Sequence, residues 1–382
     1  MTTSPLSATT QAFLADLAPL VNIDAGSRNV AHVTQLAQHM KSLYDALGFH
    51  TELQSFGPDI GEGLLATNAP DAEHYDVLLN AHLDTVYTDG TAATRPLRIE
   101  DNRVLGPGVS DCKGGVLLIY YALKALAPSV RNQLKIAVLM NPDEEIGSPY
   151  SCEWLKHHAA RAQRVLVAEA ARRGGNLVRS RKGVAVARVT FHGRAAHAGN
   201  NPEAGANANI AALRFTLEAC TLANTQKGCT VNPGVIQGGT APNVIPETAE
   251  VLLDLRYWRD EDREDLKTKI EVLAQHTWVD GVTQTVNWLA GTPAMPYTER
   301  TEGLIKEMEA AAASLGITFD WLDMGGGSDG NHMATQGVPV IDGCGPCGGA
   351  NHSSAEYLVL DKIEERIALM TEFLRQIAER NQ

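Results

Sequence analysis

The sequence predicts an α/β protein with a largely parallel sheet, into which a smaller α+β unit is inserted. Two patterns predict this fold class. Buried apolar strands alternate with amphipathic helices in the first part, and the chain changes to half-exposed alternating strands near Gly183. The length of 382 residues also exceeds what one hydrophobic core normally organises. We therefore expect a discontinuous larger domain at 1–182 and 293–382, and an inserted domain at 183–292.

The first part follows the order that is typical of a parallel sheet. Helical periodicity occurs near 12–20, 33–47 and 111–126, and buried strands are expected at 77–79, 134–140 and 165–168. In such sheets the crossovers are right-handed, and ligands bind beyond the carboxyl ends of the strands. Four polar candidates follow these strand ends, namely His82, Glu144, Glu145 and Glu169.

The inserted part has a different order of elements. We expect strands at 184–191, 231–237, 249–257 and 283–288, with helices at 205–222 and 260–276. This β-α-β-β-α-β order is the ferredoxin-like arrangement, which forms a compact unit of its own. The α/β pattern then resumes with a helix near 303–315, a strand at 338–341 and a last helix at 361–380.

Composition and charge argue against several classes of function. The formal net charge is -13 and no long run of Lys or Arg occurs, which argues against a nucleic-acid partner. No stretch of about 18 apolar residues is present, and the first residues lack the features of a signal peptide. We therefore expect no membrane association and a cytoplasmic location. The six cysteines do not resemble a disulfide framework, so reduced thiols are expected.

The strand-end residues include the side chains that zinc prefers, which are histidine and carboxylate. His82 and Asp84 lie two residues apart on an extended segment, so the carboxylate of Asp84 could hold the imidazole from behind. Asp111 opens a helix, and Glu144 is adjacent to Glu145. His352, in Asn-His-Ser-Ser, follows a further strand and would complete the set.

Each of these fragments also has a structural interpretation. The Asp-Glu-Glu run could be a solvated turn, and Asp111 could be a helix N-cap. Considered together they favour a metal site, because several carboxylates in one cleft would repel one another unless a cation neutralised them.

Eight stretches of the chain together resemble one family, the dinuclear zinc exopeptidases. This family includes glutamate carboxypeptidase, succinyl-diaminopimelate desuccinylase, aminoacylase and carnosinase-type dipeptidases, and the chain is most similar to the glutamate carboxypeptidase branch. The resemblance covers nearly the whole chain and implies a zinc-peptidase catalytic domain with an inserted lid and dimerisation domain. The stretches are LLNAHLDTVY, GPGVSDCKGG, MNPDEEIGS, AEAA, HGRAAHAGNNPEAGANA, GGTAPNVIPETAEVLLDLRY, GGGSDGN and NHSSAEY.

The resemblance implies two Zn²⁺ ions per subunit, with Co²⁺ or Mn²⁺ as alternatives. One ion would be bound by His82 and Glu169, and the other by Glu145 and His352, with Asp111 bridging the two. By the same likeness the enzyme would be a homodimer that acts on a small peptide or an N-acyl amino acid.

The resemblance also implies the catalytic and substrate-binding residues. Glu144 would be the general base for a metal-bridging water, with Asp84 as the partner of the metal-binding histidine. His197 would polarise the scissile carbonyl, usually across a dimer. The carboxylate of the substrate would be held by Asn243 and Arg256, and the glycine-rich loop with Gly326 and Gly327 would lie beside it. From the residues alone, His197 could be a surface histidine and Arg256 part of an ion pair.

Some features leave the substrate open. Glu169, where aminopeptidases and dipeptidases of the family carry aspartate, favours release of a C-terminal or N-acylated amino acid. N-acyl-amino-acid deacylase and dipeptidase activities remain alternatives. The family's glutamate-specific members lead us to expect a basic residue before the triple glycine, but Asp323 and Met324 stand there. We therefore expect Asp323 to disfavour an acidic leaving residue.

A remote alternative is a thiol-disulfide oxidoreductase. Cys344 and Cys347 have the required spacing. In that chemistry the first cysteine sits at a helix N-terminus, which lowers its pKa, whereas here glycine-rich flanks predict a loop. Cys112 is interpreted as a packed side chain and not as a ligand.

Overall fold

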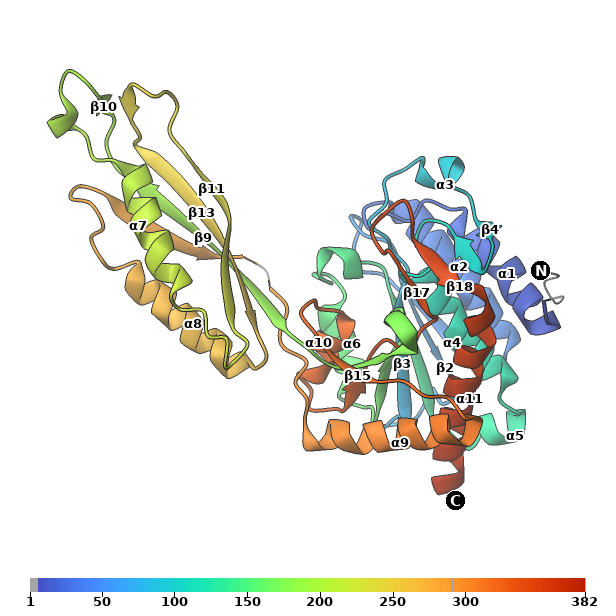
Figure 1. Ribbon diagram of the computed structural model, residues 1–382. Coiled ribbons are helices and arrows are strands. Elements are labelled where there is room, and N and C mark those ends of the chain that lie inside the picture. The colour runs from blue at the N-terminus through green and yellow to red at the C-terminus, as the bar shows by residue number, and fades with distance from the viewer. Residues whose placement is uncertain (1–5, 290, 382) are drawn as a thin grey trace. The chain divides into compact units, whose positions relative to one another are not determined.

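The computed structural model describes residues 6–289 and 291–381. Its contacts divide the chain into two compact units. The first contains the chain up to Ser180, Tyr297–Asp323 and the chain from Ser328 onward, and the second contains Arg181–Pro296 and Met324–Gly327. The blue N-terminal helices and the red C-terminal helix of Figure 1 therefore belong to the same unit.

The first unit is built around a six-stranded sheet in the order β1-β2-β6-β3-β7-β16. β3, β6, β7 and β16 are parallel, whereas β2 is antiparallel to both β1 and β6. The sheet is thus mixed, and the predicted parallel arrangement applies to four of its six strands. The strands are β1 (His50–Gln54), β2 (Gly63–Thr67), β3 (Val77–His82), β6 (Ile136–Asn141), β7 (Val165–Val167) and β16 (Val340–Ile341).

Long helices cover this sheet and bury one of its faces. Alternate residues of β3, namely Val77, Leu79 and Ala81, belong to one apolar core together with residues of these helices, as the two-residue period of a strand requires. The C-terminal helix packs against α4 and α9, and α4 in turn packs against β3. The helices are α1 (Ala8–Val21), α2 (Val30–Ala46), α4 (Lys113–Ala125), α9 (Glu299–Leu315) and α11 (Ile363–Arg380).

Shorter elements connect this framework. β4, β5, β17 and β18 form a small sheet in the order β17-β18-β5-β4, and β15 pairs with β8. α6 packs against α10, which also contacts β7. These elements are α3 (Thr91–Thr94), β4 (Arg98–Glu100), β5 (Arg103–Leu105), α5 (Pro128–Arg131), η1 (Glu144–Ile146), α6 (Cys152–Ala159), η2 (Arg173–Gly175), β8 (Leu177–Arg181), β15 (Trp321–Met324), α10 (Asp329–Ala334), β17 (Gly348–Gly349), β18 (Tyr357–Val359) and η4 (Leu360–Lys362).

The second unit is a four-stranded antiparallel sheet in the order β11-β13-β9-β14, with two helices that contact it. Its element order is the β-α-β-β-α-β order of the ferredoxin-like arrangement. Alternate residues of β9 and β13 form its core, as in a sheet with one covered face. The elements are β9 (Gly183–His192), β10 (Ala196–His197), η3 (Pro202–Ala204), α7 (Ala208–Cys220), β11 (Thr230–Gly238), β12 (Val244–Ile245), β13 (Thr248–Tyr257), α8 (Asp260–Leu273) and β14 (Thr283–Trp288).

The described part of the chain can be compared with the expectations about membrane spans and disulfides. Over residues 6–289 and 291–381, no helix combines the length and the apolar character that crossing a bilayer requires. All six cysteines are free. The cytoplasmic location stays a prediction.

Candidate metal centre

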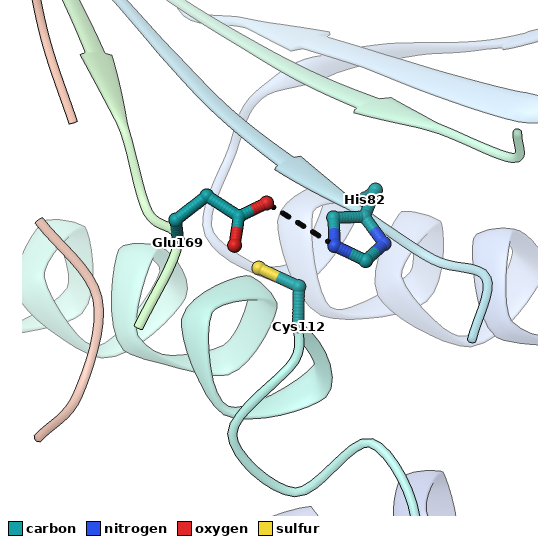
Figure 2. A group of neighbouring side chains, drawn as sticks. All are labelled: His82, Cys112 and Glu169. Carbon is teal, nitrogen blue, oxygen red and sulfur yellow. Dashed lines mark ion pairs between the residues drawn. The ribbon is translucent and has the colours of Figure 1, made fainter. Parts of the chain in front are cut away.

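One group of donors surrounds His82, the last residue of β3. Its Nε2 atom lies 3.0 Å from Asp111 Oδ1 and 3.3 Å from Glu169 Oε1. Glu169 follows β7, the strand beside β3, and Asp111 precedes α4, so three separate segments converge at the carboxyl ends of the parallel strands. Figure 2 shows the carboxylate of Glu169 directed toward the imidazole of His82.

A second group lies on the other side of Asp111. The Nε2 atom of His352 is 3.2 Å from Asp111 Oδ2 and 3.2 Å from Glu145 Oε2. Asn351 donates its side-chain amide to the same Asp111 oxygen at 3.0 Å. The two oxygens of Asp111 therefore face two different pairs of donors, His82 with Glu169 and His352 with Glu145.

Asp84 is fully buried and organises two of the segments around it. Its backbone oxygen lies 3.0 Å from Nδ1 of His82, and its Oδ1 atom lies 3.3 Å from the same nitrogen. The two carboxylate oxygens also accept the backbone N–H groups of Glu144 (3.1 Å) and Glu145 (3.2 Å), and Ser27 donates its hydroxyl at 2.6 Å. The contact of Asp84 with the imidazole of His82 was predicted, whereas its contact with the backbone of η1 was not.

The carboxyl groups of this region have raised pKa values. Burial raises the pKa of Glu144, and the carboxylates of Glu169, Asp329 and Glu145 raise it further, although His82 opposes them. Burial likewise raises the pKa of Glu145 to about 8. A third buried carboxyl, Asp329, has its pKa raised to about 7 by burial, and it accepts the hydroxyl of Ser148 at 2.5 Å. Several carboxyl groups thus share a space in which negative charge is costly.

The donor set fits divalent cations. Glu145 Oε1 and Asn351 Oδ1 are buried oxygens that have no hydrogen-bond partner. Histidine nitrogen and carboxylate oxygen together suit Zn²⁺ and its neighbours in the first transition row. A cation would also remove the repulsion among the carboxylates.

Cys112 lies close to this group but has the contacts of a packed side chain. It is fully buried, and its thiol donates to the backbone oxygen of Ala168 at 3.2 Å. Burial raises the pKa of the Cys112 thiol, which disfavours the thiolate that metal binding needs. Figure 2 shows it below the imidazole and the Glu169 carboxylate.

His197 belongs to the second unit, at the end of β10, where its strand pairs with β12. The residue is exposed. Its Nδ1 atom accepts the backbone N–H groups of Gly199 and Asn200, both at 3.1 Å. In the neutral imidazole Nε2 must then carry the proton, so this side chain presents an N–H donor.

Arg256, on β13, forms the ion pair that was the structural interpretation of this residue. Its guanidinium contacts both carboxylate oxygens of Asp254, at 2.8 and 2.9 Å, and also donates to the backbone oxygen of Gly325 at 3.3 Å. Asn243 is exposed, and its backbone oxygen accepts from the N–H of Ala198. Arg256 thus reaches the glycine-rich loop within the second unit.

Glycines 325 to 327 are part of the second unit. A Cβ atom added at Gly325 or at Gly326 would meet nothing within 4 Å. Packing therefore gives no reason for glycine at these two positions. Gly327 carries a backbone oxygen that accepts from Arg181 at 3.3 Å.

Asp323 lies in the first unit, where its charge is already compensated. Arg179 contacts both of its oxygens, at 3.0 and 3.1 Å, and Ser180 donates to one of them at 2.6 Å. The Arg179 guanidinium holds the pKa of Asp323 below its usual range. An ion-paired carboxylate repels an acidic group less than a free one, so this geometry weakens the expectation that Asp323 excludes acidic leaving residues.

The two cysteines with redox spacing lack the environment of a reactive thiol. Cys344 and Cys347 are both buried and are followed by the short strand β17 and not by a helix. Burial raises the pKa of Cys344 to about 12, whereas a thiol-disulfide oxidoreductase needs a low value. The structure therefore gives the oxidoreductase alternative no support.

Sequence reasoning missed three residues that contact the centre or its supports. Ser27 is an isolated polar residue outside any helix or strand, so no pattern indicated it. Asp329 lies in the quoted GGGSDGN stretch and begins α10, but no role was assigned to it. Glu356 lies in the quoted NHSSAEY stretch, and a carboxylate directly before the half-buried strand β18 was the available signal.

Comparison with known proteins identifies the family. The model of peptidase family M20/M25/M40 matches residues 78–376. The chain belongs to this family. Carboxypeptidase G2 of Pseudomonas sp. (strain RS-16) is 31% identical over 371 residues, which cover 96% of this chain and 89% of the relative. Acetylornithine deacetylase of Myxococcus xanthus is 31% identical over 289 residues, covering 71% and 73%.

Solved structures of M20 enzymes share the fold. The aminopeptidase PepT of Bacillus cereus superposes with a TM-score of 0.82 at 20% identity, covering 97% of this chain and 99% of that chain. The metallo-carboxypeptidase Sso-CP2 of Sulfolobus solfataricus superposes with a TM-score of 0.74 at 17% identity, covering 96% and 99%. Membership of the M20 family establishes the protein as a metal-dependent hydrolase of peptide or acyl-amino-acid bonds.

Proposed function

We propose that this M20 hydrolase is a two-zinc exopeptidase of the carboxypeptidase type that releases a C-terminal or N-acylated amino acid. One observation carries the proposal. The two carboxylate oxygens of Asp111 face separate donor pairs, one with His82 and the other with His352. Two Zn²⁺ ions held there supply Lewis-acid activation of a water and of the scissile carbonyl. His82 and Glu169 would hold one ion, and Glu145 and His352 the other.

Glu144 is the proposed general base. Its backbone N–H is fixed by Asp84, and burial raises its pKa, so its carboxylate accepts a proton more readily than an exposed one. Glu144 takes a proton from the attacking water and later gives it to the leaving amine. Asp84 keeps the imidazole of His82 and the segment of Glu144 in one arrangement during this exchange.

His197 is the proposed donor to the carbonyl oxygen of the scissile bond. Because Nδ1 accepts two backbone N–H groups, the Nε2–H group is available to the substrate. Removing such a donor typically costs about 3–4 kcal/mol of transition-state stabilisation.

The carboxylate of the substrate is proposed to bind at Arg256, with Asn243, Gly326 and Gly327 beside it. The guanidinium of Arg256 is oriented by Asp254 and reaches the glycine-rich loop through Gly325. The open space at Gly326 supports close approach of a ligand, because packing does not explain the glycine there.

A hollow beside Glu145 is the proposed site for the acyl or N-terminal part of the substrate. It has a volume of about 670 Å³, and besides Glu145 it is lined by residues 26–29, 85–89 and Ile146. Val86 and Ile146, which are 41% and 39% exposed, give this lining an apolar part. We therefore expect an aliphatic or aromatic acyl group in preference to a charged one.

We propose in addition that the chain forms a homodimer through its second unit. Ile210, Leu213 and Leu217 on α7 are exposed at helical spacing, and the edge strand β11 exposes Val235 and Ile236. Light scattering of the wild type and of Leu217→Glu tests this proposal. A monomeric wild type contradicts it, and a dimer that Leu217→Glu dissociates supports it.

N-acyl-amino-acid deacylase activity is the second candidate, because acetylornithine deacetylase and succinyl-diaminopimelate desuccinylases are also similar to this chain. Dipeptidase activity on the same fold is the third. A panel of N-acyl amino acids, N-blocked peptides and free dipeptides separates these activities, since only dipeptidases require a free amino group.

The panel is to be run on zinc-loaded protein, with Glu144→Gln as the control. We expect hydrolysis of N-blocked substrates, loss of activity with a chelator, and loss of at least about 10²-fold in kcat for Glu144→Gln with its zinc content unchanged. Equal activity of Glu144→Gln and wild type, or a single zinc per subunit in the fully active protein, would contradict the proposal.

A further inference from the structure

Glu356 is a fully buried carboxylate whose oxygens accept four hydrogen bonds. Its Oε1 atom accepts the backbone N–H groups of Ser110 (2.8 Å) and Asp111 (3.0 Å). Its Oε2 atom accepts the backbone N–H of Gly108 (2.9 Å) and the hydroxyl of Tyr87 (2.7 Å). Three of the four donors belong to the loop that ends in Asp111.

Glu356 also lies four residues after His352 and directly before β18. Strand β18 pairs with β5, and β5 leads into the loop that carries Asp111. The carboxylate therefore lies between the segments of the two residues and contacts one of them directly. β18 pairs with both β17 and β5, so the small sheet fixes the backbone directly after Glu356.

The segment of His352 is tied to the same carboxylate through Tyr87. The Tyr87 hydroxyl, besides its contact with Glu356, lies 2.9 Å from the backbone oxygen of Ser353. Arg95 donates to that same oxygen at 2.9 Å, and its guanidinium lies 4.9 Å from the centre of the Tyr87 ring. One cluster, in which Glu356 is buried and Tyr87 and Arg95 are half-buried, thus contacts Asp111 and the residue next to His352.

Packing alone does not require a carboxylate at this position. A buried charge is costly unless hydrogen bonds satisfy it, and an apolar side chain of similar size would avoid that cost. The carboxylate instead satisfies three backbone N–H groups of residues 108–111, which would otherwise be buried without acceptors. Charge-assisted bonds of this kind are short and directional, so they fix the position of the loop.

We propose that Glu356 is a positioning residue, which holds the Asp111 loop and the His352 segment at the spacing that two cations sharing one carboxylate require. The inference rests on the proposed two-zinc function. Glu356 does not touch the cations or the substrate; it acts through the backbone of Asp111 and through Tyr87.

Glu356→Gln is the main test, because glutamine keeps the size and one acceptor oxygen but directs an amide N–H₂ group at a second set of donors. Zinc affinity is measured by competition with a chromophoric chelator, and zinc content by metal analysis. We expect the affinity for zinc to fall about 10–100-fold, as with other residues that orient metal ligands. We also expect kcat/KM to fall at limiting zinc and to recover with excess zinc.

Glu307→Gln is the matched control. Glu307 is a largely buried carboxylate of the same unit that pairs with Arg164 and Arg380, away from the candidate centre. We expect it to lower the melting temperature of the zinc-free protein and to leave zinc affinity unchanged. If Glu356→Gln behaves in the same way, with a lower melting temperature and wild-type zinc affinity, its role is only structural and the inference is overturned.

Tyr87→Phe decides the question if Glu356→Gln does not fold. It removes one hydroxyl and keeps the ring beneath Arg95. We expect a several-fold loss of zinc affinity, and wild-type affinity would overturn the inference.

The zinc content of the wild-type protein separates the two proposals. If the wild type binds fewer than two zinc ions, the two-zinc function fails and the inference fails with it. If it binds two and both variants bind zinc like the wild type, only the inference about Glu356 fails.

Discussion

Asp84 contacts His82 and the backbone of Glu144 and Glu145, so a single substitution there disturbs three candidate site residues. In Asp84→Asn the amide retains one acceptor oxygen and replaces the other by a donor. We expect a loss of about 10–100-fold in zinc affinity or kcat/KM, as for other changes behind a metal-binding histidine. Chelator competition and steady-state kinetics measure it. Asp45→Asn, in an exposed pair with Lys41, serves as the control, and equal effects of the two substitutions would contradict the role of Asp84.

Arg256 offers a prediction about substrate binding. In Arg256→Lys the two-point contact with a carboxylate becomes a point charge. We expect KM to rise by about tenfold with a smaller change in kcat, because the contact exists in both the ground state and the transition state. Arg188→Lys, in an ion pair with Glu250 on the same sheet, is the control. An unchanged KM for Arg256→Lys would contradict the proposed contact of Arg256 with the substrate and leave the ion pair with Asp254 as its role.

The candidate site could be predicted from the sequence to the extent that its residues follow strand ends. Residue type and position predicted that His82, Glu145 and Glu169 would meet, and the structure brings them together with Asp111 and His352. Their roles as ligands stay a prediction. Glu356 could not be predicted in this way, because a side chain that binds backbone N–H groups leaves no spacing pattern in the sequence.

Two glycines in different helices allow a matched pair of predictions about the effect of a glycine-to-alanine substitution on stability. A Cβ atom at Gly115, in α4, would lie 2.0 Å from the backbone oxygen of Ala168, whereas a Cβ atom at Gly303, in α9, would meet nothing within 4 Å. Gly115→Ala must therefore push α4 away from the end of β7, and we expect a loss of several kcal/mol or failure to fold. Gly303→Ala should stabilise by about 0.5–1 kcal/mol, because alanine has the higher helix propensity.

Thermal and urea denaturation of the two variants measure these changes. A melting temperature of Gly115→Ala equal to that of the wild type would contradict the close approach of α4 to β7. A lower melting temperature of Gly303→Ala would contradict the open space at α9.

At the scale of elements, long periodic segments could be predicted and short polar ones could not. The helix of 303–315 is observed as Glu299–Leu315, and the strand of 283–288 is observed with the same bounds. β1 and β2 were missed because β1 is polar and only half buried, and β2 has five residues without a clear alternation. Of these two strands, β2 makes the sheet mixed, because it runs antiparallel to both of its neighbours.

At the scale of the whole molecule, we expect the free energy of unfolding to depend on pH, because the protein buries a histidine. His158 lies against Tyr75 and Trp154, and burial lowers its pKa to about 4. The unfolded chain, with a pKa near 6.5, then binds more protons between about pH 6.5 and pH 4. The contribution of neutral His158 to the free energy of unfolding is therefore fully present above pH 6.5 and is lost as the pH falls toward 4. At pH 5 the free energy of unfolding is lower by roughly 2 kcal/mol.

Urea denaturation of zinc-free wild type and His158→Gln at pH 7 and pH 5 measures this effect. We expect the variant to be less stable at pH 7 but to lose less stability on acidification, because glutamine does not titrate. Equal losses in the two proteins would show that His158 does not contribute to the pH dependence.

Removal of the metal should lower the stability of the whole first unit. The candidate ligands come from separate segments, and a cation binds only the folded arrangement of them, so binding shifts the equilibrium toward the folded state. We expect zinc to raise the melting temperature of the wild type and of Glu144→Gln by several degrees, and that of His352→Ala by less. Calorimetry with and without zinc measures these shifts. Equal shifts in all three proteins would place the metal elsewhere.

The division of the chain also determines when the protein can become active during its synthesis. The residues between Arg181 and Pro296 form nearly all of the second unit and leave the ribosome as one continuous piece. The first unit must wait for its last segment, because α11 packs on α4 and α9 and His352 precedes that helix. Nascent chains that stop before α11 would therefore expose the apolar face of α4. The first unit, although its first residues are translated earliest, would be the last to complete its fold.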